Sequence, residues 1–209
     1  MYLPASFKEE RVPVLHDAIR NIKVGTLITL GGEGLEASHL PMLIDPEPAP
    51  FGTLIGHLAR ANPQWKRAAA APESLVTFLG PNAYVTPSWY ETKRETGKVV
   101  PTWNYITVHA TGTPRFIEDR DELLDIVTRL TKTHESARKA PWAVTDAPAD
   151  YIEGMLKAIV GFALPITRLE GKWKLSQNRN PADIAGVREG TAAEPGDNAA
   201  ALAAAMADL

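Results

Sequence analysis

Residues 80–110 read GPNAYVTPSWYETKRETGKVVPTWNYITVHA, a stretch that combines turn signals, aromatic residues and one long strand pattern. Gly80-Pro81 and Thr96-Gly97 are the turn signals. Side chains alternate across a strand, so the run after Pro101 has two faces. One face carries Trp103, Tyr105, Thr107 and His109, and the other carries Thr102, Asn104, Ile106, Val108 and Ala110. Hydroxyls, an amide and Lys93 beside flat rings suit a planar ligand with an anionic tail, although an aromatic-rich barrel strand explains them equally well.

The rest of the chain predicts further short strands and a few helices. The periodicity indicates a helix over residues 12–22 and a second helix capped by Asp119 or Asp121. A third helix is expected to start between residues 146 and 150, and a short turn of helix follows Asn62-Pro63. Strands are predicted over residues 25–30 and 35–44 (a hairpin), 53–57, 75–79, 83–85, 102–113 and 159–169. Pro165 within the last strand favours an edge position or a bulge. These elements predict a mainly β, α+β fold: an antiparallel barrel with peripheral helices.

Composition limits the class of protein. The length of 209 residues and the 44% hydrophobic share fit one domain, here residues 1–190, followed by an Ala-rich tail over residues 191–209. We expect that tail to be mobile, although Asn198 could cap a short helix. The absence of cysteine excludes disulfides and thiolate sites. No basic leader or long apolar run occurs, so we expect a cytoplasmic protein with no membrane segment.

Charge and motifs exclude several kinds of chemistry. The net charge of −3 and the lack of a dense Lys/Arg run argue against tight binding to DNA phosphates. No two histidines have the spacing of a helical metal site, and no metal is expected. The Gly-x-Ser-x-Gly elbow of serine hydrolases is also missing. The cations best placed to meet a phosphate or carboxylate are Arg60, Lys93, Arg94, Lys172 and Lys174.

Six blocks of sequence carry a resemblance to a known family. They are YLPASF (2–7), SHLP (38–41), GHLARANPQW (56–65), FLGPNAYVTPSWY (78–90), VPTWNY (100–105) and GKWKLSQN (171–178). In this order, and with tryptophan at fixed places, the blocks resemble the FMN-binding split-barrel proteins of the PaiB type, which are negative transcriptional regulators of bacterial degradative-enzyme and sporulation genes. The resemblance covers nearly all of the chain up to about Gly190.

The resemblance implies an FMN-binding split barrel in which two subunits pair and the flavin sites form at their interface. It implies that Ser38, His39 and Leu40 offer groups to the isoalloxazine ring, and that the phosphate and ribityl side meets Arg60, Asn62, Ser88, Trp89, Tyr90 and Lys93. Thr102, Trp103 and Asn104 would join from the long strand, and His57 is a further cofactor-binding candidate. We expect Lys93 or Arg60 to meet the phosphate.

Three functions remain open at this point. A flavin-binding regulator is the first, although no helix-turn-helix with basic positions is visible, so direct DNA contact is weakly supported. The second is a flavin-dependent oxidoreductase like the pyridoxamine-phosphate oxidases, in which the cofactor supplies the chemistry. The third is a haem-handling split barrel with His39, His57 or His109 as axial ligand.

Overall fold

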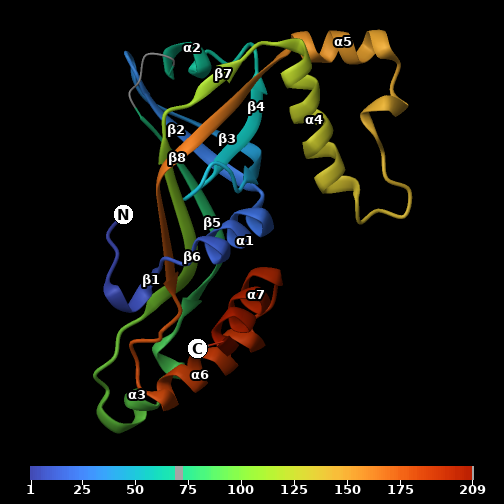
Figure 1. Ribbon diagram of the computed structural model, residues 1–209. Coiled ribbons are helices and arrows are strands. Elements are labelled where there is room, and N and C mark those ends of the chain that lie inside the picture. Colours follow the sequence, from blue (N-terminus) through green and yellow to red (C-terminus); the bar gives the residue numbers. More distant parts are fainter. Residues whose placement is uncertain (69–72, 209) are drawn as a thin grey trace. The chain divides into compact units, whose positions relative to one another are not determined.

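The structure is a computed structural model that describes residues 1–68 and 73–208 (Figure 1). The chain forms two compact units. The terminal unit comprises Met1–Leu15, Leu79–Val108 and Glu170–Leu209, and the central unit comprises His16–Phe78 and His109–Leu169. Among the described residues, no helix is both long and apolar enough to cross a bilayer.

The described residues build an eight-stranded sheet. Its strands are β1 (Lys8–Glu9), β2 (Val24–Gly31), β3 (Gly34–Asp45), β4 (Thr53–Ala59), β5 (Ser74–Val85), β6 (Thr102–Gly112), β7 (Arg115–Ile117) and β8 (Ile159–Lys174). They pair in the order β1-β8-β4-β3-β2-β5-β6. In addition, β6 and β7 each pair with β8. Because the order returns from β6 to β8, the strands close a ring, as in a barrel.

In the central unit, a hairpin and two helices surround one hydrophobic cluster. Strands β2 and β3 pair antiparallel from Val24↔Pro41 to Gly31↔Gly34. Helix α4 (Arg120–Glu135) packs on β3 and β4 and contacts α5 (Ala149–Lys157). The Asp119 carboxylate caps α4 by accepting from the backbone N–H groups of Asp121 and Glu122, each at 3.0 Å. The cluster beneath these helices comprises Ile117, Leu123, Ile126, Leu130 and Leu156.

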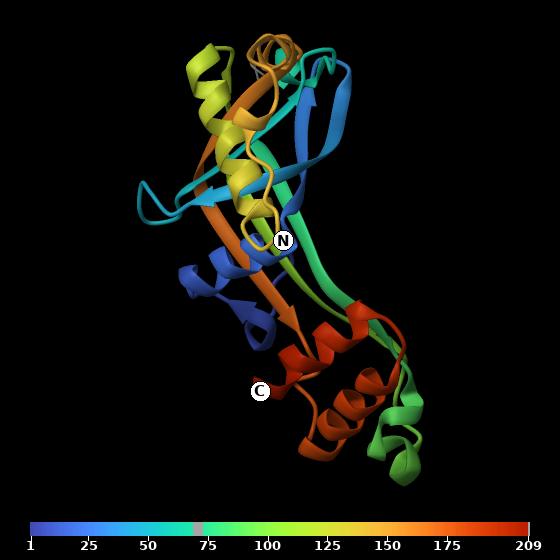
Figure 2. The same ribbon diagram turned by 90° about the vertical axis from the view of Figure 1, so that its right-hand side faces the viewer.

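The terminal unit has its own core and three helices. They are α3 (Glu91–Thr96), α6 (Pro181–Ala193) and α7 (Asp197–Ala205), and α6 and α7 lie side by side in both views (Figure 2). Buried residues from the strands and helices make one cluster: Val85, Tyr90, Ile106, Leu175, Val187, Leu202 and Met206. The remaining helices are α1 (Val12–Ile22), whose first residues belong to this unit, and α2 (Gln64–Ala68) in the central unit.

Several predictions from the sequence are confirmed. The helix over residues 12–22, the hairpin, the short helix after Pro63 and the helix capped by Asp119 are all present. The fold class is confirmed too, because an antiparallel sheet closes on itself and helices lie outside it. On the long strand, Asn104, Ile106, Val108 and Ala110 of one face are buried, whereas on the other face Trp103 is 54% exposed and Thr107 is buried.

Two strand predictions were wrong, and both errors concern proline. The strands predicted over residues 75–79 and 83–85 form one strand, β5, that runs through Gly80-Pro81. The φ that proline imposes is compatible with an extended chain, so this dipeptide need not turn. Pro165 does not lie at an edge, because β8 has neighbours on both sides. It pairs with Thr53, and the next N–H, of Ile166, donates to Gly52 O at 2.9 Å.

The C-terminal segment differs from the expected tail. The boundary drawn at residue 190 falls inside α6, and residues 197–205 form α7 with Gly196, not Asn198, at its N-cap. Leu202 and Met206 are fully buried against the core of the terminal unit. Helix α6 itself was missed, although Asn180-Pro181-x-Asp183 carries a capping residue, an N1 proline and an acid in the first turn.

Candidate functional site

A polar cavity of 150 Å³ lies in the terminal unit, where the start of β6 meets the end of β8. Its lining residues are Phe7, Tyr90, Thr102, Asn104, Lys174, Ser176, Asn178 and Arg179. The volume is below the roughly 300–1,000 Å³ of pockets that enclose a whole small molecule. This cavity therefore suits one end of a ligand rather than an entire flavin.

Hydrogen bonds fix the polar wall of this cavity. Asn104 Nδ2 donates to Ser176 Oγ at 2.9 Å, and Ser176 Oγ lies 3.2 Å from Asn104 Oδ1. Both side chains are buried, and Ser176 adopts a left-handed backbone conformation with φ of 66°. Lys174 Nζ donates to Thr102 Oγ1 at 2.5 Å and also to the Trp103 carbonyl. The wall thus consists of groups whose positions are set by their neighbours.

Positive charge collects at the same place. Burial, followed by the charges of Lys172 and Arg179, lowers the pKa of Lys174 from its ordinary value. Lys172 Nζ donates to Tyr2 O at 3.2 Å and lies over the rings of Tyr2 and Tyr105, at 5.5 and 5.3 Å from their centroids. Among the described residues, none that lines the cavity is acidic. A bound anion would therefore offset the mutual repulsion of these cations.

Tyr90 lines the cavity and carries a hydroxyl without a partner. Its side chain is 2% exposed, and its hydroxyl is buried without a hydrogen-bond partner. The Arg179 guanidinium lies over its ring, 4.9 Å from the centroid. A buried hydroxyl without a partner is costly, because its hydrogen bonds to water are lost on folding.

A second set of predicted residues forms a network in the central unit. Ser38 Oγ donates to Gln64 Oε1 at 2.5 Å, and Asn62 Nδ2 donates to Ser38 Oγ at 2.9 Å. Gln64 is 1% exposed, and its Nε2 is within 3.3 Å of Leu27 O, Thr29 Oγ1 and Glu36 O. The sequence reasoning missed Gln64 as a participant. Its place in the NPQW block, beside Asn62, was the available signal.

The other predicted residues of the central unit have partners of different kinds. His39 Nδ1 and Thr26 Oγ1 are 2.8 Å apart across the hairpin, and Leu40 is half-buried on the same strand. The Arg60 guanidinium donates to Glu118 Oε2 at 2.5 Å and to the Lys157 carbonyl at 2.9 Å. The Arg60 guanidinium therefore already has partners within the protein, and a phosphate would have to compete with the Glu118 carboxylate for it.

Ser88, Trp89 and Lys93 lie next to α6 in the terminal unit. Lys93 Nζ donates to Ser88 Oγ at 3.1 Å, and both side chains face solvent. Trp89 packs against α6 so closely that a Cβ at Gly190 would lie 2.3 Å from its ring. Of the sequence-predicted residues, Tyr90, Thr102 and Asn104 meet in the cavity, together with Lys174. Arg179 was missed, because it follows the end of the strand pattern.

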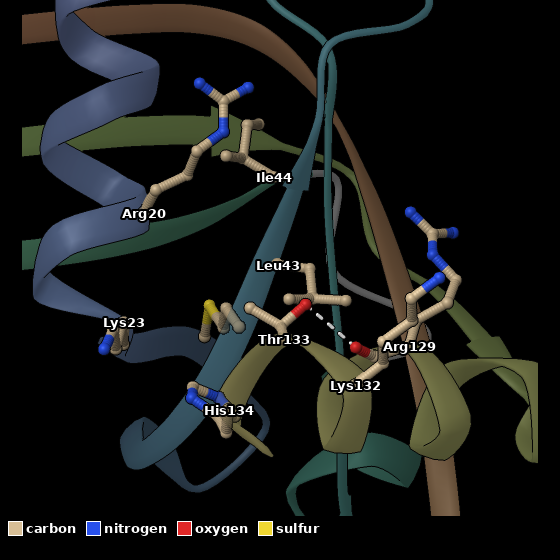
Figure 3. Close-up of a pocket in the computed structure, with 9 residues that line it drawn as sticks. Arg20, Lys23, Leu43, Ile44, Arg129, Lys132, Thr133 and His134 are labelled. Atoms are coloured by element: carbon tan, nitrogen blue, oxygen red, sulfur yellow. Dashed lines mark hydrogen bonds between the residues drawn. The ribbon is translucent and has the colours of Figure 1, made fainter. Parts of the chain in front are cut away.

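A basic hollow of 270 Å³ in the central unit offers a second cluster of cations (Figure 3). Arg20 projects from α1 and Arg129 from α4, on either side of Leu43 and Ile44 of β3. Arg20 is paired with Asp17 at 2.7 Å and Arg129 with Asp45 at 3.0 Å. These carboxylates neutralise part of the charge of the two arginines, while Lys23 and Lys132 also line the hollow.

Comparison with known proteins identifies the family. A family model described as "Putative FMN-binding domain" matches residues 1–168. The chain belongs to this FMN-binding family. The match includes Tyr90, Thr102 and Asn104 and ends before Lys174 and Arg179.

One curated relative and two solved structures are informative. The chain is 34% identical to the Protease synthase and sporulation protein PAI 2 of Bacillus subtilis (strain 168), over 100% of this chain and 97% of that protein. It is similar in fold to a conserved hypothetical protein of Mycobacterium tuberculosis (TM-score 0.59, 11% identity, 86% of this chain and 94% of that one). It is also similar in fold to the FAD and haem binding protein of Mycobacterium smegmatis (TM-score 0.58, 17% identity, 80% and 73% covered).

Proposed function

We propose that the protein is an FMN-binding regulatory protein, and that the cavity of the terminal unit holds the flavin phosphate. The observation that carries this proposal is that Lys174 and Arg179 line the same polar cavity and that none of the described lining residues is acidic. The regulatory part rests on the full-length similarity to PAI 2, a relative named for protease synthesis and sporulation. A chain without cysteine needs no oxidising compartment, and we place it in the cytoplasm.

The residues of the cavity fit a phosphate in chemical type. Lys174 and Arg179 supply positive charge, while Tyr90, Asn104 and Thr102 supply polar groups at fixed positions. The ring would extend beyond the cavity, where Trp103 offers an exposed aromatic surface. A bound flavin would supply electron and hydride transfer, and a flavin-dependent oxidoreductase is the alternative function. An absorption spectrum of the purified protein distinguishes flavin from haem.

A titration of FMN, followed by quenching of flavin fluorescence, tests this proposal. A charge-assisted hydrogen bond to phosphate contributes about 1.5–3 kcal/mol, so Lys174→Met and Arg179→Met should each weaken FMN binding roughly tenfold or more. Riboflavin has no phosphate, and its affinity should change little in the same variants. Lys98→Met, which alters an exposed lysine of the terminal unit, serves as the matched control.

Two further variants separate this site from the one expected from the sequence. If Lys93→Ala or Arg60→Ala weakens FMN binding and Lys174→Met does not, the phosphate lies at the residues that the family resemblance implies. If wild type shows no saturable binding of FMN, the cofactor proposal fails altogether.

The regulatory proposal does not require tight binding to DNA. The net charge is −3, and the arginines of the basic hollow are paired with carboxylates. We therefore expect only weak, salt-sensitive binding of duplex DNA at physiological salt. A gel-shift with a promoter fragment and a random-sequence duplex measures this. Tight, sequence-selective retention of the promoter would contradict the prediction and support direct repression.

A further inference from the structure

An apolar cavity of 330 Å³ lies in the central unit between α4, α5, β4 and residues 142–144. Its walls include Val127, Trp142, Val144, Ile152, Met155 and Leu156. The volume falls within the range of about 300–1,000 Å³ typical of small-molecule sites, and such sites are mostly apolar with a few polar groups. The packing of α4 and α5 thus leaves room that side chains do not fill.

His57 brings an imidazole ring to this apolar wall. It belongs to β4 and lines the cavity, and its Nδ1 is buried without a hydrogen-bond partner. Burial lowers the pKa of His57, so the imidazole is neutral near pH 7. A neutral imidazole with an unsatisfied ring nitrogen has a hydrogen bond to offer, and leaving it unmade is unfavourable.

Charge limits what can occupy the cavity. Among the residues that line it, none is an aspartate, glutamate, lysine or arginine. Besides His57, the side-chain polar groups available are the hydroxyls of Thr131 and Tyr151 and the indole N–H of Trp142. An ion would therefore lose its hydration without gaining a counter-charge. The occupant should be uncharged.

We propose that this cavity binds a small, uncharged, mainly aromatic molecule whose hydroxyl group hydrogen-bonds with the His57 imidazole. A hydroxyl both donates and accepts, so it matches either tautomer of the neutral ring. Trp142 and Tyr151 are 46% and 57% exposed, and they place aromatic surface where a flat ring can pack. A second apolar hollow of 350 Å³ shares Thr131, Trp142 and Val144 and leaves room for a substituent.

The proposal is independent of flavin binding. No residue of the His57 cavity lines the polar cavity of the terminal unit. Loss of binding at one site should therefore leave the other intact, and FMN affinity becomes an internal control for both.

A pair of probes that differ in one group tests the inference. Calorimetric titration with 2-naphthol and with 2-methylnaphthalene compares a hydroxyl with a methyl group on the same ring. In wild type, 2-naphthol should bind roughly three- to tenfold more tightly, the factor that one net hydrogen bond supplies. In His57→Leu this preference should disappear, while 2-methylnaphthalene still binds.

A filling substitution gives a second, independent check. Met155→Trp should block the cavity and weaken both probes, whereas Val100→Trp adds the same ring at an exposed position of the terminal unit and should have no effect. Neither variant should change FMN affinity. Equal affinity of the two probes for wild type would overturn the proposal, as would a preference that persists in His57→Leu. The absence of saturable binding, or unaltered binding to Met155→Trp, would do the same.

Discussion

Tyr90 and His57 are the two sequence-predicted residues that keep a buried polar atom without a partner in the structure. Among the residues described, most side-chain polar atoms in the interior are satisfied, as the buried Asn104–Ser176 pair shows. The two residues line cavities in different units, and one of these cavities is polar and the other apolar.

The lowered pKa of His57 makes a prediction about stability. Below the unfolded pKa of about 6.5, the unfolded chain binds a proton that the folded chain does not accept. His57 should therefore reduce the free energy of unfolding as the pH falls from about 6.5 to its folded pKa, and have no such effect above that window. Of the described residues that line the cavity, none carries an Asp, Glu, Lys or Arg charge that would reverse this sign.

Urea unfolding of wild type and His57→Gln at pH 7.5 and 5.5 measures the effect. Wild type should lose more stability between the two pH values than the variant, because other titrating groups contribute equally to both. An equal loss in the two proteins would show that the imidazole remains hydrated in the folded state.

Strand alternation predicted which residues of the long strand share a face. Thr102, Asn104 and Lys174 lie on predicted strands or next to one, and they meet in one cavity. Gln64 and Arg179 were missed because their roles depend on contacts across the fold. Gln64 bonds with groups on β2 and β3, and Arg179 packs over Tyr90, 89 positions away in the chain.

Secondary-structure elements were predicted best where local signals agree with the tertiary structure. Helix α4 has a capping aspartate and an apolar stripe, and hairpin β2–β3 has a glycine turn between alternating strands. Prediction failed in β5 because Gly80-Pro81 was taken as a break, whereas the strand runs through it. In β8 the strand itself was predicted, but Pro165 was expected at an edge or a bulge, and it pairs with Thr53 in a strand that has neighbours on both sides. In the Ala-rich α7, alanine occurs on all sides of the helix, so the sequence shows no contrast between an apolar and a polar face. The contacts of Leu202 and Met206 with the core position this helix.

The contact between α6 and Trp89 depends on two glycines, which gives a prediction for the helix. A Cβ at Gly186 would lie 2.0 Å from the Trp89 carbonyl oxygen, so Gly186→Ala must displace α6 or the backbone before α3. We expect a loss of stability of about 1–3 kcal/mol, typical of overpacking. A Cβ at Gly154 in α5 would meet no atom within 4 Å, and Gly154→Ala should instead stabilise by about 0.5–1 kcal/mol.

Thermal and urea unfolding of the two variants compares the same chemical change at two helix positions. Opposite signs are expected for Gly186→Ala and Gly154→Ala. If Gly186→Ala proves as stable as wild type, α6 does not pack on Trp89 in solution, and Arg179, just before that helix, would not be held beside the polar cavity.

At the scale of the whole molecule, exposed apolar side chains predict a homodimer. In the terminal unit, Tyr84 and Trp103 are exposed and meet edge to face, with ring centroids 6.1 Å apart. In the central unit, Leu30 and Leu35 are 60% and 76% exposed on the β2–β3 hairpin. Soluble monomers rarely expose several large apolar groups on strands, and a symmetric pair of subunits would cover them.

Light scattering at micromolar concentration tests this prediction. One chain has a mass of 22.7 kDa, and we expect twice that value for wild type. Trp103→Glu and Leu35→Glu each place a charge on a predicted contact surface and should shift the mass toward one subunit. Tyr151→Glu alters an exposed aromatic residue outside these surfaces and should leave the dimer intact. A mass of one subunit for wild type would contradict the homodimer, and the flavin site would then have to be complete within a single chain.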